Sequence, residues 1–133
     1  MKLWHSIDGS VLDSLDNTGH GYEQRITIPE FTFLGKQNQP DFGVIRLWFY
    51  GRDKTIELKS LKNYLFQYRN TIISYERCID VLYKHIIQAY DPVRVRIEID
   101  FRPRGGISSR MTADSDWGHL GGTDKLWPNH KDT

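Results

Sequence analysis

Residues 94–101 alternate strictly between polar and apolar side chains, and this period of two constrains the fold more than any other feature of the sequence. The apolar positions are Val95, Ile97, Ile99 and Phe101, and the polar positions are Arg94, Arg96, Glu98 and Asp100. Such a pattern predicts a strand that packs one face on a core and turns the other toward water or a polar interface.

Two further strands are predicted earlier in the chain. Residues 23–33 alternate up to Pro29, which cannot donate a ladder hydrogen bond and therefore indicates an edge or a bulge. Residues 43–50 are apolar almost throughout and rich in aromatic and branched side chains, which favours a strand covered on both faces. We expect a last short strand from Ile107, after the Pro103-Arg104-Gly105-Gly106 segment ends the alternating strand.

Apolar residues at helical spacing predict two helices between the second and third of these strands. The first covers about residues 57–70, and the second about residues 75–90, where Asp91-Pro92 ends it. The order of elements predicts an α+β fold, an antiparallel four-stranded sheet with two helices on one face. Its free edges need a cover or a copy of the same chain, so we expect a homo-oligomer assembled through strand edges.

Composition divides the 133 residues into three stretches around a single domain. Residues 1–21 form a polar N-terminal arm, residues 22–110 the regular domain, and residues 111–133 a polar C-terminal tail. We expect the tail to be mobile. The tail also contains four large apolar residues, which leave open that it docks on a neighbouring subunit: Trp117, Leu120, Leu126 and Trp127.

Charge and cysteine content exclude several classes of function. The 18 Lys and Arg nearly balance the 17 Asp and Glu, so we expect neither nucleic acid nor a membrane as a partner. The single cysteine, Cys78, excludes an internal disulfide and fits a reducing compartment, so the expected location is cytoplasmic. The chain shows neither an apolar run long enough for a membrane span nor a signal peptide. His119, Asp124 and His130 fit no compact metal site, and we expect no metal.

Three clusters could carry chemistry. Asp41, in Gln39-Pro40-Asp41-Phe42, places a carboxylate at a strand entrance, where Asp is also a common turn former. In the segment from Glu57 to Lys62, Glu57 suits a helix start, whereas Lys59 opposes the helix dipole and suggests an anionic ligand or a solvated basic face. Glu76 follows Ser74, a candidate N-cap, and alone is only a first-turn acid.

Together these clusters resemble motifs of the QueF-type NADPH-dependent 7-cyano-7-deazaguanine reductases, the nitrile reductases of queuosine biosynthesis, which have the tunnelling fold. The matching segments span almost the whole regular region. They are Pro29-Glu30-Phe31-Thr32, Gln39-Pro40-Asp41-Phe42, Glu57-Leu58-Lys59-Ser60-Leu61-Lys62, Arg69-Asn70, Tyr75-Glu76, Asp91-Pro92 and Pro103-Arg104-Gly105-Gly106-Ile107.

The resemblance implies a role for each matching position. Glu76 would bind the guanine-like edge of the deazapurine, with Tyr75 beside it where the family usually has histidine. The rest of the base pocket would be Ile56, Glu57 and Leu58. The NADPH phosphates would be held by Lys59, Ser60 and Lys62. Asp41 would donate a proton, and the subunits would form a ring with pockets at their boundaries.

The family's nucleophilic cysteine, which forms a covalent thioimide with the nitrile, has no counterpart here. Counting back from Asp41 places it at Leu34, and counting forward from Thr32 places it at Gly35. Cys78 lies two positions past Glu76, on another side of the predicted helix, and we interpret it as a buried structural thiol. Three functions remain open: a reductase of this family, a catalytically silent deazapurine-binding protein, or a structural subunit.

Overall fold

The computed structural model describes residues 2–19, 21–125 and 127. Its strands are β1 (Lys2–Leu3), β2 (Ser14–Asp16), β3 (Gln24–Leu34), β4 (Pro40–Tyr50), β5 (Lys54–Ile56), β6 (Thr71–Ile72), β7 (Arg94–Arg104) and β8 (Ile107–Asp114). Its α-helices are α1 (Leu58–Phe66) and α2 (Tyr75–Tyr90). Its short 3-10 helices are η1 (Trp4–Ser6), η2 (Gly9–Val11), η3 (Gln67–Asn70) and η4 (Gly118–Leu120).

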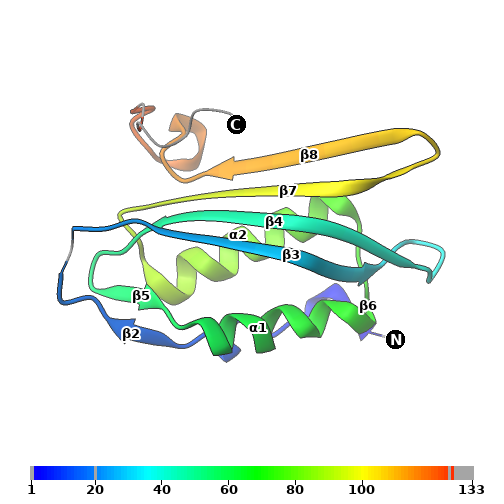
Figure 1. The fold of residues 1–133 in the computed structure, drawn as a ribbon, viewed down its shortest axis with the longest axis horizontal. Coiled ribbons are helices and arrows are strands. Elements are labelled where there is room, and N and C mark those ends of the chain that lie inside the picture. The colour runs from blue at the N-terminus through cyan, green and yellow to red at the C-terminus, as the bar shows by residue number, and fades with distance from the viewer. Residues whose placement is uncertain (1, 20, 126, 128–133) are drawn as a thin grey trace.

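The main sheet has the strand order β1-β6-β3-β4-β7-β8 (Figure 1). The four long strands pair antiparallel, as the sequence predicts for an α+β fold. The predicted strand number was wrong, however, because the sheet has six strands: β1 and β6 pair in parallel, and β6 joins β3 at a single position, Leu34 opposite Ile72. A separate small sheet pairs β2 with β5. Segments of two or three residues carry no readable period, so these short strands could not be predicted.

The core lies between one face of the main sheet and the two helices. The alternation in β7 is confirmed, since Val95, Ile97, Ile99 and Phe101 are all buried on the core face. Both helices contribute to the same core cluster, through Leu61, Tyr64 and Leu65 of α1 and Cys78, Val81, Leu82, Ile86 and Tyr90 of α2. The two helices therefore cover the same face of the sheet.

Pro29 produces the irregularity that its position predicts. The pairing of β3 with β4 shifts between Ile28 and Phe31, which is the mark of a bulge. On the other side of β3, the described part of the chain pairs with it only at Leu34. The stretch of β3 before that residue therefore presents a free strand edge.

The described parts of the N-terminal arm and of the C-terminal tail contain regular structure. In the arm, Ile7 and Leu12 are buried in the core. At the other end, β8 continues to Asp114, four residues past the expected domain boundary at residue 110. Beyond it, the Trp127 ring lies 5.0 Å from the Tyr50 ring. Met1 and His20 of the arm, and residues 126 and 128–133 of the tail, including Leu126 and His130, lie outside the described residues.

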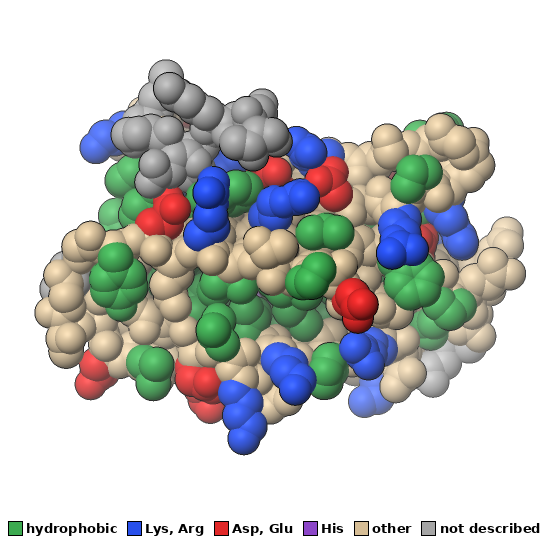
Figure 2. Space-filling view, in the orientation of Figure 1, with side chains coloured by type: hydrophobic (Ala, Val, Ile, Leu, Met, Phe, Trp, Pro, Cys, Tyr) green, Lys and Arg blue, Asp and Glu red, His purple; other side chains and the backbone are tan. Residues whose placement is uncertain are grey.

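The face of the sheet away from α2 carries charged side chains, and Figure 2 shows basic and acidic side chains beside one another on it, with hydrophobic side chains between them. Its most buried pair is Arg94 and Asp114, whose side chains are 4% and 1% exposed. Asp114 accepts two hydrogen bonds from the Arg94 guanidinium and one from Arg96. Burial alone would raise the pKa of Asp114, but these bonds and the arginine charges lower it overall.

We predict that Asp114→Ala destabilises the fold by about 3–5 kcal/mol, because it leaves the Arg94 guanidinium buried without its counter-charge. Urea unfolding followed by circular dichroism measures the change. Asp100→Ala is the matched control, since Asp100 pairs with the half-exposed Arg46 and Arg110 and should cost only about 0–1 kcal/mol. Equal losses in the two variants would contradict this account of the polar face.

Candidate functional site

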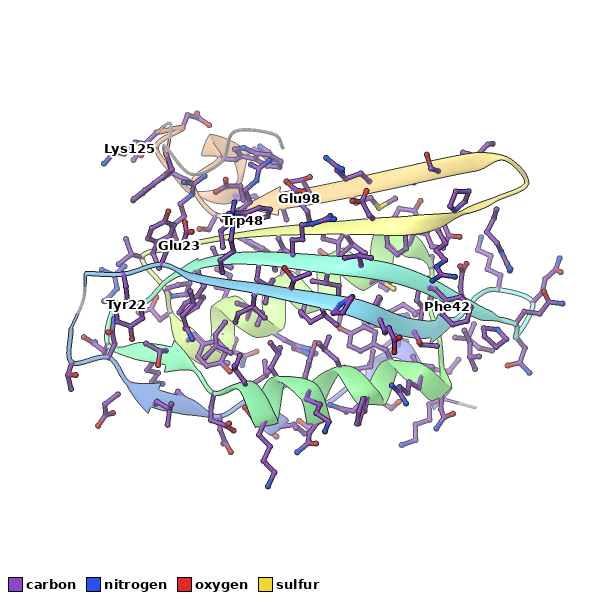
Figure 3. The ribbon with its side chains drawn as sticks, viewed as in Figure 1. Tyr22, Glu23, Phe42, Trp48, Glu98 and Lys125 are labelled. Atoms are coloured by element: carbon purple, nitrogen blue, oxygen red, sulfur yellow. The ribbon has the colours of Figure 1, made fainter. Side chains whose placement is uncertain are left out.

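A cavity of about 380 Å³ lies where the β3–β4 turn meets the start of α2. It contains three residues that the sequence singled out, Asp41, Tyr75 and Glu76, together with Gly35, Lys36 and Arg104. In Figure 3, Phe42, the neighbour of Asp41 on β4, marks this end of the sheet. Segments far apart in the sequence thus line one cavity, which contains both charged and apolar groups.

The β3–β4 turn is tight and fixes where Asp41 begins its strand. The Gly35 N–H donates to the Gln39 carbonyl at 2.9 Å, and the Asn38 N–H donates to the Gly35 carbonyl at 2.8 Å. Asn38 adopts a left-handed backbone conformation, with φ of 59°, which asparagine tolerates better than most residues. The turn sets Phe33 opposite Asp41 in the ladder, so Asp41 lies at the cavity wall.

Asp41 is a buried carboxylate with an incomplete set of partners. It accepts a hydrogen bond from the Phe42 N–H at 2.9 Å and another from the Tyr75 hydroxyl at 2.7 Å. The Arg104 Nε lies 3.7 Å from Asp41 Oδ2, within ion-pair range but too far for a hydrogen bond. Asp41 is therefore no simple turn former, because its side chain joins β4 to α2 and β7.

Tyr75 is held on both its ring and its hydroxyl. Its ring stacks on Phe101 of β7, with centroids 4.2 Å apart and planes 8° from parallel. Burial, and then the hydrogen bond to the Asp41 carboxylate, raises the pKa of Tyr75 to about 12. The hydroxyl therefore stays protonated at neutral pH and acts as the donor to Asp41.

Glu76 lines the same cavity and remains available to a ligand. It occupies the first turn of α2, whose N-cap is Ser74, as predicted: the Ser74 hydroxyl accepts a hydrogen bond from the Arg77 N–H at 3.2 Å. Because Ser74 caps the helix, the Glu76 carboxylate is not used for that purpose. Its side chain is exposed on the cavity wall.

The other predicted site residues lie elsewhere in the protomer. The junction of β5 and α1, with Ile56, Glu57 and Leu58, is at the opposite end of the sheet from the β3–β4 turn (Figure 1). Glu57 is the N-cap of α1, and its carboxylate accepts from the Lys59 and Ser60 N–H groups at 2.8 and 2.9 Å. Ile56 is buried in the core, whereas Leu58 is exposed. One protomer therefore does not bring the two predicted halves together.

The residues predicted to hold NADPH phosphates fit an anion only in part. Lys59 and Lys62 are exposed on α1 and could reach a phosphate. Ser60 is buried, and its hydroxyl bonds the Glu57 carbonyl at 2.8 Å and the backbone of Asp13. The first backbone N–H groups of α1 are taken by Glu57, so the helix start offers little to a phosphate.

The structure distinguishes the two candidate positions for the missing cysteine. Leu34 is a strand residue, paired with Pro40 and Ile72. Gly35 lies on the cavity wall, where a Cβ would be 3.9 Å from Asp41 Oδ2. The geometry thus favours Gly35 as the position that faces the cavity. Cys78 is fully buried, and burial raises the pKa of its thiol far above the ordinary value, as expected for a structural thiol.

Arg104 and Lys36 complete the cavity, and sequence reasoning gave neither a role at the site. The sequence predicts the Pro103-Arg104-Gly105-Gly106 segment as a strand end and as one of the family-like segments, without a site role for Arg104, although an arginine beside two glycines at a strand terminus could have suggested a ligand contact. Within residues 2–19, 21–125 and 127, no group of three potential metal-ligating side chains comes together. No helix in that part of the chain is long and apolar enough to cross a membrane.

The fold and this cavity define an α+β protein with a candidate site lined by two acidic and two basic side chains. Comparison with known proteins identifies the class further: the profile of the family described as QueF-like protein matches residues 40–118. The chain belongs to the QueF-like family.

Curated relatives agree with this assignment. A NADPH-dependent 7-cyano-7-deazaguanine reductase of Gloeobacter violaceus is 41% identical over 93 residues, which cover 67% of this chain and 66% of the relative. The enzyme of the same name from Chlorobaculum parvum is 35% identical, with 80% of this chain and 94% of the relative covered. The chain therefore spans about two thirds of the length of the first relative and nearly all of the second.

A solved structure supports the fold. The archaeosine synthase QueF-Like in the apo form superposes with a TM-score of 0.62 over 69% of this chain and 91% of that one, at 17% sequence identity. At this identity the likeness establishes the fold alone. It confirms that the sheet and its helices follow a QueF-like arrangement.

We predict that the Cys78 thiol of the native protein does not react measurably with Ellman's reagent at pH 8, because the side chain is buried and its pKa is raised. In guanidinium chloride, one thiol per chain should react at once. The rate of colour development measures both. Rapid labelling of the folded protein would show that Cys78 is accessible and reopen it as a candidate nucleophile.

Proposed function

We propose that this protein binds 7-cyano-7-deazaguanine or a related purine-like base in the cavity between the β3–β4 turn and α2. The observation that carries the proposal is the exposed carboxylate of Glu76 on the wall of a cavity of about 380 Å³. The names of the relatives supply the ligand class, since they are 7-cyano-7-deazaguanine reductases.

Glu76 has the chemistry that the guanine-like edge requires. That edge presents a ring N–H and an amino group, both donors, and a carboxylate accepts both at once. Such charge-assisted hydrogen bonds contribute about 1.5–3 kcal/mol each. Glu76 lies in the first turn of α2, at the positive end of the helix dipole, where an acidic side chain is favourable.

The proposal includes a second copy of the chain at each site. Ile56, Glu57 and Leu58 lie at the far end of the protomer, so they can meet Glu76 only across a subunit boundary. Two features support assembly through strand edges: the free edge of β3, and an apolar cavity of about 300 Å³ between β3 and α1, lined by Ile28, Leu61 and Phe66 among others. A ring of subunits with the tunnelling fold, as the resemblance implies, would bring the β3 edge and this apolar cavity into contact with a neighbouring subunit.

A second candidate function is NADPH-dependent reduction of the nitrile, in the cytoplasm. The relatives' names favour it, and Asp41, buried beside the cavity, could supply a proton. Lys59 and Lys62 would contact the cofactor phosphates from the second copy, whereas the N–H and hydroxyl of Ser60 already bond Glu57 within the chain. Against it stands the absence of a nucleophile, because Gly35 faces the cavity and Cys78 is buried. The silent binding protein is therefore the better supported of the two.

Isothermal titration calorimetry with 7-cyano-7-deazaguanine tests the binding proposal. Glu76→Ala should weaken binding at least about 100-fold, because it removes both charge-assisted hydrogen bonds. Asp80→Ala is the matched control: Asp80 is one turn further along α2, exposed, and outside the cavity, and should leave affinity unchanged. Unchanged affinity in Glu76→Ala would rule out this mode of binding.

The reductase candidate is tested separately by following NADPH absorbance with protein and 7-cyano-7-deazaguanine. We expect no oxidation by the wild type above the rate without protein. Loss of a nucleophile from a covalent mechanism can lower the rate by about 10⁶-fold. Oxidation that depends on the nitrile and disappears in Asp41→Asn would instead establish the reductase and show that the cysteine is dispensable.

A further inference from the structure

The N-terminal arm lies along α2, and its first residues reach the start of that helix. A cavity of about 190 Å³ lies between them, and its lining includes residues from both: Trp4, His5, Ile7, Arg77, Val81 and His85. We propose that the arm holds the start of α2, and with it Glu76, in the position that binds the base, and that His85 makes this hold sensitive to pH. The inference rests on the proposed function, because it concerns the affinity of that site for its ligand.

Two contacts of the arm reach the segment that carries Glu76. The Arg77 guanidinium, on the residue after Glu76, lies over the Trp4 ring, 4.2 Å from its centroid. In addition, β1 pairs with β6, which leads into the N-cap of α2 at Ser74. On its other side β6 pairs with β3 at a single position, so β1 supplies the larger part of its strand pairing. Release of the arm would therefore free the first turn of α2 to move.

The middle of the arm packs closely on His85. A Cβ at Gly9 would lie 2.6 Å from His85 Cδ2 and 2.8 Å from Cγ, so the ring rests directly on the glycine backbone. Next to this contact, the Gln67 amide accepts from the Asp8 N–H at 2.7 Å and donates to the Asp8 carbonyl at 3.0 Å. A cavity of about 590 Å³ opens beside the ring and gives water access to it. A change in the charge or position of the ring therefore acts directly on the arm.

The hydrogen bonds behind His85 favour its neutral form. Its Nδ1 lies 2.6 Å from the Tyr64 hydroxyl, which in turn lies 2.8 Å from the Tyr68 hydroxyl. Both tyrosines are fully buried, and among the described residues the Tyr68 hydroxyl has no partner besides Tyr64. Both hydroxyl protons are used only if Tyr68 donates to Tyr64 and Tyr64 donates to Nδ1. That arrangement requires an Nδ1 without a proton.

Protonation of the ring reverses this chain of hydrogen bonds. Nδ1 then donates to Tyr64, Tyr64 donates to Tyr68, and the Tyr68 proton is left in the core without an acceptor. Burial lowers the pKa of His85 below its ordinary value of 6.5, and the nearby Asp8 carboxylate raises it by a smaller amount. Because the pKa is lower in the folded state, the contact with the arm is at full strength above about pH 6.5 and weakens as the pH falls below that value.

The other ionisable groups around the ring do not reverse this direction. In the described part of the chain they are His5 and Asp8 of the arm, and Asp80 and Lys84 of α2. Asp80 and Lys84 pair with each other at 3.1 Å, and His5 would add positive charge in the same pH range. Asp8 is exposed and already accepts two hydrogen bonds from Ser10, so solvent screens its attraction for a charged ring. Acidification therefore loosens the arm.

The test is calorimetry of the full chain with 7-cyano-7-deazaguanine at pH 7.5 and pH 5.5, both above the range in which carboxyl groups ordinarily take up protons. We expect affinity to fall at least about threefold at pH 5.5, because only molecules with the arm in place bind well. His85→Phe keeps a ring on Gly9 that takes up no proton, so its affinity should be equal at the two pH values. His5→Phe, in the same arm, is the matched control and should retain the wild-type dependence.

Two further variants test the arm at pH 7.5 alone. Gly9→Ala places a methyl group where the His85 ring lies, and should lower affinity to about that of the wild type at pH 5.5. Gly19→Ala is its control, since a Cβ there lies 3.6 Å from the Tyr22 ring, an ordinary contact, and affinity should not change. Trp4→Ala removes the ring beneath Arg77 and should weaken binding about two- to fivefold.

Hydrogen exchange of the amides of residues 2–13, corrected for the intrinsic effect of pH, reports on the arm itself and should be faster at pH 5.5. Circular dichroism confirms that each variant is folded before affinities are compared. Equal wild-type affinities at the two pH values, or unchanged exchange in the arm, would overturn the inference and leave the proposed function standing. A pH dependence that survives His85→Phe would overturn the role given to His85. No binding at either pH would overturn both the inference and the proposed function.

Discussion

The two-sidedness of the main sheet is the constraint on which the rest of this structure depends. Apolar side chains of β7 and its neighbours point to one face, and α1 and α2 must cover it. The start of α2 is thereby brought over the end of β4, and the Tyr75 ring comes to stack on Phe101. The hydrogen bond from Tyr75 to Asp41 follows from that placement. The packing of the helices on the sheet therefore determines where the candidate site lies.

Two acidic residues at the starts of helices illustrate how the neighbouring residues decide whether a carboxylate is structural or available to a ligand. Glu57 and Glu76 both stand at helix starts, and electrostatics favours each of them there. Glu57 is itself the N-cap and uses both carboxylate oxygens on backbone N–H groups. Ser74 takes the capping role in α2, so Glu76 has its oxygens available for a ligand. A difference of two positions relative to the cap separates a structural carboxylate from a candidate recognition group.

Sequence reasoning predicted the long elements because their periods are strong. The start of β7, the limits of α2, the bulge at Pro29 and the burial of Cys78 all follow from patterns within a single strand or helix, although β7 continues to Arg104, past its predicted end at Phe101. The short strands β1, β5 and β6 could not be predicted in this way, because tertiary pairing and not local pattern defines them. Arg104 was missed for a related reason: it is the last residue of β7, and the antiparallel pairing of β7 with β4 brings it to Asp41. The wide separation of Glu57 from Glu76 likewise depends on the path of α1 across the molecule.

The burial of Cys78 has a practical consequence for studying assembly. With the chain's single thiol enclosed in the core, the folded surface offers no competing sulfur to a reagent. A cysteine introduced at an exposed position would be the sole attachment point for a spin label or fluorophore, with no need to remove the native residue. In the proposed assembly, distances between labels on neighbouring copies would report how the helix start of one copy approaches the turn of the next.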